Sequence, residues 1–125
     1  MRKWFICAFW VACGGFTVLA LLPGEYLESA ALNWWDKAQH ASAFFVLGVL
    51  GFGAYADTSR RVGLGLLAYG AAIELAQAAT GWRSGDWQDW VADAVGLALV
   101  WLCFIFVRLR KSSLRLQQLE LDTCK

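Results

Sequence analysis

The stretch RSGDWQDWVADAVG, residues 83–96, places one arginine and three aspartates just before and inside the start of a strongly apolar run. On a helix that begins near Asp86, the residues Asp89, Asp93 and Gly96 share one stripe. This stripe has to face protein or water, since an ionisable group that faces lipid costs roughly 2.5 to 3.5 kcal/mol on insertion scales. Asp86 fits the N-cap of the helix, with Asp89 at its third position in a capping-box arrangement. Asp93 lies too deep to cap and is a candidate functional residue.

Apolar residues dominate the chain on both sides of this stretch. Hydrophobic residues make up 59% of the 125 positions and there is one proline, which excludes disorder and favours a single membrane domain. Four apolar runs, 4–22, 38–56, 62–80 and 90–107, each approach the roughly 20 residues that cross a bilayer core. The first run lacks the polar stripe that a soluble bundle needs. We therefore predict an all-α polytopic membrane protein with four transmembrane helices in residues 1–107 and a basic tail in 108–125.

The basic residues predict the orientation of these helices. With the N-terminus in the cytoplasm, nine of the eleven lysines and arginines fall in cytoplasmic segments, and only Lys37 and Arg83 fall outside. This bias follows the positive-inside rule, so both termini are expected in the cytoplasm. Seven of the ten acidic residues lie on or near the outer side. The first run is longer than a usual signal-peptide core and no small-x-small site follows it, so it is expected to remain as a helix.

Several classes of function lack support in the sequence. The four cysteines show no CxxC spacing, so we interpret them as small apolar packing residues. The basic residues flank helices as topology signals and form no basic stripe with interleaved aromatics, so nucleic-acid binding is not expected. Phosphate loops and dinucleotide fingerprints are absent.

Polar residues interrupt three of the four apolar runs. Asp36, Lys37 and His40 open the second run, and Glu74 and Gln77 lie three positions apart in the third. Counted at ~1.5 Å per residue from the end of the third run, Glu74 lies about 9 Å below the outer interface. Small residues in the same run allow helix backbones to approach closely. We therefore expect polar faces of three helices to converge on one outer-leaflet pocket.

Eight residues are candidates for this pocket. The candidates for catalysis are His40, Glu74 and Asp93, and the candidates for ligand binding are Asp36, Lys37, Gln77, Arg83 and Asp89. An acid within an apolar helix has to be protonated, paired or open to water, and each state indicates a function. No metal or other cofactor is predicted, although one histidine with several carboxylates is compatible with Mg²⁺ or Mn²⁺. A cluster that only fixes helix packing remains an alternative.

With these residues in place, the segment 36–96 resembles the VanZ-like family of small polytopic bacterial membrane proteins, named for a protein associated with teicoplanin resistance. The resemblance rests on a DKxxH opening, an ExxQ pair and an R-x5-D-x3-[ND]-x2-G tail, carried here by Asp36, Lys37, His40, Glu74, Gln77, Arg83, Asp89, Asp93 and Gly96. Asp93 stands where the family usually has Asn, which adds negative charge. The resemblance implies a multi-pass protein of the bacterial cytoplasmic (inner) membrane, linked to envelope biology or glycopeptide tolerance, and implies no particular reaction.

Recognition of a polar headgroup is the first functional hypothesis. The ligand would be a lipid-linked cell-wall intermediate or a glycopeptide-related molecule, with Lys37 and Arg83 pairing its phosphate or carboxylate groups. Because these two cations stand among several carboxylates, a zwitterionic or hydroxyl-rich group fits better than a simple anion. The lipid bilayer is the expected partner, and a homo-oligomer is compatible with the sequence.

Two further hypotheses stay open. The first is a membrane-embedded hydrolase or transferase acting on an envelope lipid, with His40 as general base, oriented by Asp36 or Asp93, and Glu74 as acid. The other is a proton-coupled small transporter that uses Glu74. A strong positive-inside bias argues against the dual orientation of small four-helix transporters.

Overall fold

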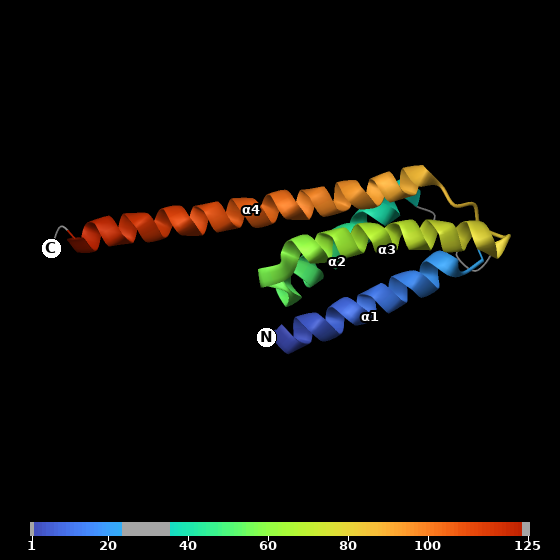
Figure 1. Cartoon of the computed structure of the whole chain (residues 1–125), viewed down its shortest axis with the longest axis horizontal. Coiled ribbons are helices and arrows are strands. Elements are labelled where there is room, and N and C mark those ends of the chain that lie inside the picture. The colour runs from blue at the N-terminus through green and yellow to red at the C-terminus, as the bar shows by residue number, and fades with distance from the viewer. Residues whose placement is uncertain (1, 24–35, 124–125) are drawn as a thin grey trace.

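The computed structural model describes residues 2–23 and 36–123 as a bundle of helices, with no strand in these ranges. In chain order the elements are α1 (Arg2–Leu21), α2 (Asp36–Ala54), the short 3₁₀ helix η2 (Ala56–Thr58), α3 (Ser59–Thr80) and α4 (Trp87–Thr123). The last turns of α1 and α3 and the first turns of α2 and α4 lie together at one end of the bundle (Figure 1). We call this the site end.

Three helices of the described ranges are long and apolar enough to cross a membrane. They span Arg2–Leu21, Ala56–Thr80 and Trp87–Arg115. The 19 residues of α2 begin with a polar turn that includes Lys37, Gln39 and His40, and this turn lowers the hydropathy of the whole helix. The predicted all-helical fold is thus confirmed for the described residues, and three of its helices have the length and apolarity of membrane spans.

The fourth helix continues well beyond the expected end of its membrane segment at Val107. It has 37 residues, a length of ~55 Å at 1.5 Å per residue. Figure 1 shows it projecting past the other helices toward the C-terminus. No glycine or proline follows Gly96 in the chain, and the tail is rich in Arg, Lys, Leu and Gln, which are good helix formers. The basic tail is therefore a direct extension of α4 as far as Thr123.

The interior of the bundle is apolar and centres on Phe44 of α2, which is fully buried. Its ring packs edge-on against Phe16 of α1 at 5.5 Å between centroids, and Tyr69 of α3 lies at 6.0 Å. Large apolar side chains such as Leu64 and Leu75 point outward. An apolar surface around an apolar core is what a bilayer requires of a protein within it.

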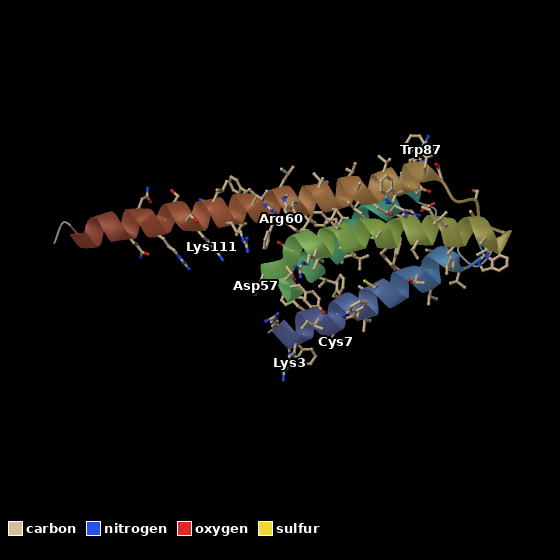
Figure 2. The ribbon with its side chains drawn as sticks, viewed as in Figure 1. Lys3, Cys7, Asp57, Arg60, Trp87 and Lys111 are labelled. Carbon is tan, nitrogen blue, oxygen red and sulfur yellow. The ribbon has the colours of Figure 1, made fainter. Side chains whose placement is uncertain are left out.

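Charged side chains lie at the two ends of the apolar bundle. Figure 2 shows Lys3, Asp57 and Arg60 away from the site end. The ion pair of Lys37 with Asp86 lies at the site end. Arg2 Nε donates to the carbonyl of Ala54 at 3.2 Å, at the last residue of α2. A cation at a helix C-terminus is favourable because the last carbonyls have no partner within the helix.

Helices α2 and α4 approach each other closely at Gly96. A Cβ built on Gly96 would meet the carbonyl oxygen of Ala41 and would lie 3.0 Å from the backbone nitrogen of Phe45. Backbone atoms of two packed helices cannot move aside as a flexible side chain does. Glycine at this position therefore fixes the distance between α2 and α4, one turn from the pair formed by His40 and Asp93.

Substitution of this glycine tests the close approach. We expect Gly96→Ala to cost about 1–3 kcal/mol, because the added methyl group forces the two backbones apart. Gly65→Ala is the matched control, since a Cβ at Gly65 has no atom of the described residues within 4 Å and alanine favours a helix. Thermal unfolding of both variants in detergent checks this, and equal midpoints would contradict it.

Candidate functional site

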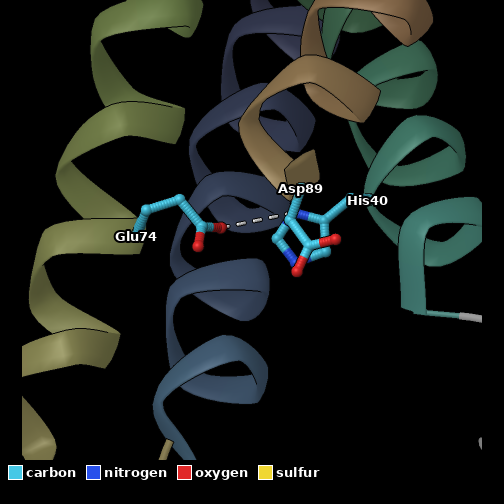
Figure 3. A group of neighbouring side chains, drawn as sticks. All are labelled: His40, Glu74 and Asp89. Atoms are coloured by element: carbon cyan, nitrogen blue, oxygen red, sulfur yellow. Dashed lines mark ion pairs between the residues drawn. The ribbon is translucent and has the colours of Figure 1, made fainter. Parts of the chain in front are cut away.

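Three helices bring buried polar side chains together at the site end. His40 comes from α2, Glu74 from α3, and Asp89 and Asp93 from α4, and none of the four is more than 8% exposed. Figure 3 shows His40, Glu74 and Asp89 extending from their three helices toward a common centre. We call these four residues the acid–histidine cluster.

His40 lies at the centre of the acid–histidine cluster. Its Nδ1 is 3.0 Å from Asp93 Oδ1 and 3.8 Å from Glu74 Oε1. The ring is also held from the side by Phe16, whose plane is nearly perpendicular to it at 5.6 Å between centroids. The histidine thus has a fixed orientation between two carboxylates.

Two carboxylate oxygens of the cluster are buried and have no hydrogen-bond partner among the described residues: Glu74 Oε1 and Asp93 Oδ2. Asp93 Oδ2 points at Gly70 of α3, where a Cβ would lie only 2.5 Å from it. Gly70 is one of the small residues of the third apolar run, and it leaves room for the Asp93 carboxylate. An unpartnered buried carboxylate oxygen is costly, so these two oxygens would be stabilised by a hydrogen-bond donor, a proton or a cation.

The loop between α3 and α4 folds back over Glu74. Gly81 ends α3 in the left-handed conformation, with φ of 79°. A Cβ on Gly85 would clash with the carbonyl oxygen of Glu74, so the loop backbone lies directly against α3. In this position the backbone N–H of Asp86 donates to Glu74 Oε2 at 2.8 Å. One oxygen of Glu74 is therefore fixed while the other stays available.

Asp86 is the N-cap of α4, as predicted. Its Oδ1 accepts the backbone N–H of Gln88 at 2.9 Å, which satisfies one of the free donors of the first turn. The expected capping box is different, because the backbone N–H of Asp86 donates to Glu74 in place of Asp89. Asp89 faces Lys37 instead, with 3.3 Å between Nζ and Oδ1. Asp89 therefore belongs to the acid–histidine cluster and does not cap α4.

Lys37 links the cluster to solvent. Its ammonium lies 3.0 Å from Asp86 Oδ2 and 3.3 Å from Asp89 Oδ1, and its side chain is partly exposed. The hydrogen bond to Asp86, together with that to Asp89, raises the pKa of Lys37. The backbone N–H of Gln88, followed by the Lys37 ammonium, lowers the pKa of Asp86. Both groups are charged at neutral pH and hold the mouth of the cluster together.

Two predicted ligand residues have partners elsewhere. Gln77 Nε2 donates to the carbonyl of Ala20 at 3.0 Å, and Arg83 Nε donates to that of Leu22 at 3.3 Å. Trp82 Nε1 adds a third bond to the carbonyl of Leu21 at 3.2 Å. The final carbonyls of α1 have no partner within their own helix, so these donors cap it. The ExxQ spacing could not reveal that Gln77 faces α1.

Asp36 is the first residue of α2, but its side chain lies outside the described part of the chain. Of the two acids expected to orient His40, the structure assigns the hydrogen bond to Asp93. A groove of ≈550 Å³ runs between α2 and α4 beside Lys37, with Ser42 and Val91 among its walls. Lys37 therefore has the walls of the groove on one side and the carboxylates of Asp86 and Asp89 on the other.

Comparison of the chain with protein-family models, curated proteins and solved structures found no match. The resemblance to VanZ-like proteins thus rests on its motif residues and stays a prediction.

The cap at Asp86 predicts how stability responds to pH. Since the pKa of Asp86 is lowered in the folded protein, its charged form contributes stability above about pH 4, its value in an unfolded chain. This contribution is lost as the pH falls through the lower folded value. Asp86→Asn keeps a capping oxygen but no charge, so we expect it to be less stable than wild type at pH 7. The unfolding midpoints of wild type and Asp86→Asn should converge as the pH falls from 7 to 3. A difference that stays constant with pH would contradict a stabilising charge on Asp86.

Proposed function

We propose that the protein crosses a bacterial cytoplasmic membrane four times, with both termini in the cytoplasm, and binds the polar headgroup of an envelope lipid at its site end. Headgroup binding is supported by the buried oxygens of Glu74 and Asp93 that have no hydrogen-bond partner among the described residues. The motif resemblance supports both halves and extends the proposal to glycopeptide tolerance.

The course of α2 supports four crossings. It runs back from the site end to the opposite end, between two helices of membrane length. Its polar first turn is largely covered by protein, since His40 is buried and Lys37 is paired with Asp86. A polar group that is paired inside the bundle costs far less in a membrane than one that faces lipid.

The charge distribution supports the proposed orientation. Arg2 and Arg108 donate to the carbonyls of Ala54 and Ala56, both away from the site end. Arg60 is exposed in the first turn of α3, near the same end. Basic residues concentrate on the cytoplasmic side of membrane proteins. The site end, with its acids, then faces out of the cell.

Cysteine labelling tests this topology. In a background with Cys124→Ser, we expect Ser84→Cys, in the exposed loop at the site end, to react with a membrane-impermeant maleimide in intact cells. Thr58→Cys, exposed between α2 and α3, should react only after permeabilisation. Labelling with the opposite pattern would place the cluster in the cytoplasm and remove an external headgroup as its ligand.

The chemistry of the site end favours a headgroup with hydrogen-bond donors. Arg83 and Gln77 donate to α1, which leaves Lys37 as the cation that faces the acids through a described ion pair. The free carboxylate oxygens of Glu74 and Asp93 accept hydrogen bonds from ammonium or hydroxyl groups. Lys37 lies at the rim, where it can contact a phosphate. A zwitterionic or sugar-bearing headgroup meets both requirements.

The groove between α2 and α4 gives such a lipid a place for its chain. Its walls include Ala38, Ala41 and Val95, and it begins beside Lys37. A lipid that lies there presents its headgroup to Lys37 and its hydrocarbon to the apolar walls. Entry from the bilayer, without passage through water, then suits a ligand of low solubility.

Lipid binding tests the recognition proposal. The full-length protein in nanodiscs is titrated with a lipid-linked cell-wall precursor, phosphatidylethanolamine or phosphatidylglycerol, and bound lipid is counted by native mass spectrometry. We expect Glu74→Gln to weaken binding of the preferred lipid at least tenfold, since a charge-assisted hydrogen bond of about 1.5–3 kcal/mol is lost. Asp57→Asn is the control, because Asp57 is exposed at the opposite end.

Equal affinity of wild type and Glu74→Gln for all three lipids would refute recognition at this cluster. The same variants report on glycopeptide tolerance through the teicoplanin susceptibility of cells that express them. A wild-type gain in tolerance that Glu74→Gln loses and Asp57→Asn retains is the expected pattern.

The hydrogen bond between His40 and Asp93 favours a second function, hydrolysis of or group transfer from the bound lipid. With Nδ1–H donating to Asp93, the imidazole keeps a lone pair on Nε2 with which to take a proton from an attacking water or hydroxyl. Glu74 is the neighbouring acid that can protonate a leaving oxygen. Product analysis of the same nanodiscs distinguishes the two functions, since turnover that His40→Gln abolishes requires catalysis in addition to binding.

A further inference from the structure

The acid–histidine cluster concentrates negative charge where little positive charge faces it. Glu74 and Asp93 both face the imidazole of His40, which carries at most one positive charge. Both acids are buried, and each keeps an oxygen without a hydrogen-bond partner among the described residues. Buried carboxylates are stable when paired, protonated or bound to a metal ion. The charge balance of the cluster therefore favours one additional cation.

Three side chains of the cluster have the spacing of metal ligands. His40, Glu74 and Asp89 each offer one ligand atom, and these atoms lie within 4.8 Å of one another. An ion with ligand distances of about 2.1 Å holds neighbouring ligands about 3 Å apart and opposite ligands about 4.2 Å apart. Small rotations of the side chains in Figure 3 would therefore close the three around one ion.

Each of the three ligands is also held from behind by a second group. Asp93 Oδ1 accepts a hydrogen bond from His40 Nδ1, so Nε2 is the ring nitrogen left for a cation. Glu74 Oε1 lies 3.8 Å from Nδ1 and has to rotate toward Nε2 to share that ion. The backbone N–H of Asp86 holds Glu74 Oε2, so that Oε1 remains available. Lys37 holds Asp89 at Oδ1. Metal-binding histidines and carboxylates typically have such outer partners, which fix their orientation.

From this geometry we propose that His40, Glu74 and Asp89 bind a divalent cation of the Mn²⁺ type, with Asp93 as the positioning residue for His40. One imidazole with two carboxylates suits Mn²⁺, because carboxylate and water oxygens are its usual ligands and it accepts imidazole. Remaining positions are filled by water or by a phosphate oxygen of the headgroup. In that position the ion adds the positive charge that Arg83, bound to α1, does not supply.

Cation binding is tested without any lipid, so its outcome is independent of the proposed recognition function. The full-length protein is purified in detergent, stripped with EDTA and titrated with Mn²⁺ while electron paramagnetic resonance separates free from bound ion. We expect one bound Mn²⁺ per chain, with a nitrogen coupling in pulsed spectra from the His40 ring. Glu74→Gln and Asp89→Asn should each weaken binding at least tenfold, and Asp57→Asn should leave it unchanged.

Asp93→Asn separates positioning from ligation. It should weaken Mn²⁺ binding by about 10- to 100-fold, as loss of an outer partner does at other metal sites, while the nitrogen coupling of the residual bound ion remains. His40→Gln should remove that coupling. Circular dichroism and gel filtration of each variant verify its fold.

The wild-type titration alone decides the proposal if variants unfold. Absence of a bound Mn²⁺ signal at millimolar ion, or a bound ion without nitrogen coupling, would overturn it. Lipid binding that persists in EDTA together with absent Mn²⁺ binding would reject the metal site and leave headgroup recognition standing.

Discussion

The contact between the backbones of α2 and α4 at Gly96 is the constraint on which the rest of the site depends. It sets the distance between the two helices one turn from His40 and Asp93, so the imidazole and the carboxylate meet at 3.0 Å. A wider spacing would separate these two groups inside an apolar bundle, where neither has water as an alternative partner. A residue without a side chain thus determines the geometry of the residues that carry the chemistry.

The polar residues of the site end have two separate roles. Gln77 and Arg83 donate to the carbonyls of Ala20 and Leu22 at the end of α1, whereas Glu74 and Asp93 both face His40. Both groups belong to the same sequence motifs. Some residues of these motifs cap α1 and so hold it against the other helices. Other residues of the same motifs form the buried cluster, which α1 helps to enclose. The residues of the motifs therefore need not all contact a ligand.

An acid at position 93 changes the balance of this site relative to the amide that the resemblance leads one to expect. Asp93 places a second carboxylate on His40, beside Glu74, and one of its oxygens points into the space left by Gly70. An amide would supply a donor there, and with it a hydrogen bond that needs no counter-ion. The carboxylate instead favours a cation or a donor-rich headgroup, which is why both proposals involve positive charge or hydroxyl groups.

Sequence alone determined the features that depend on local physics: the helical apolar runs, the N-cap at Asp86 and the asymmetric distribution of basic residues. These follow from hydropathy and from bonds within one turn, which neighbouring residues decide. It did not reveal that α4 continues past Val107, because the edge of an apolar run does not end a helix made of good helix formers. Only the tertiary structure assigned Gln77 and Arg83 to α1 and His40 to Asp93, since these partners lie more than fifty positions apart and meet through helix packing.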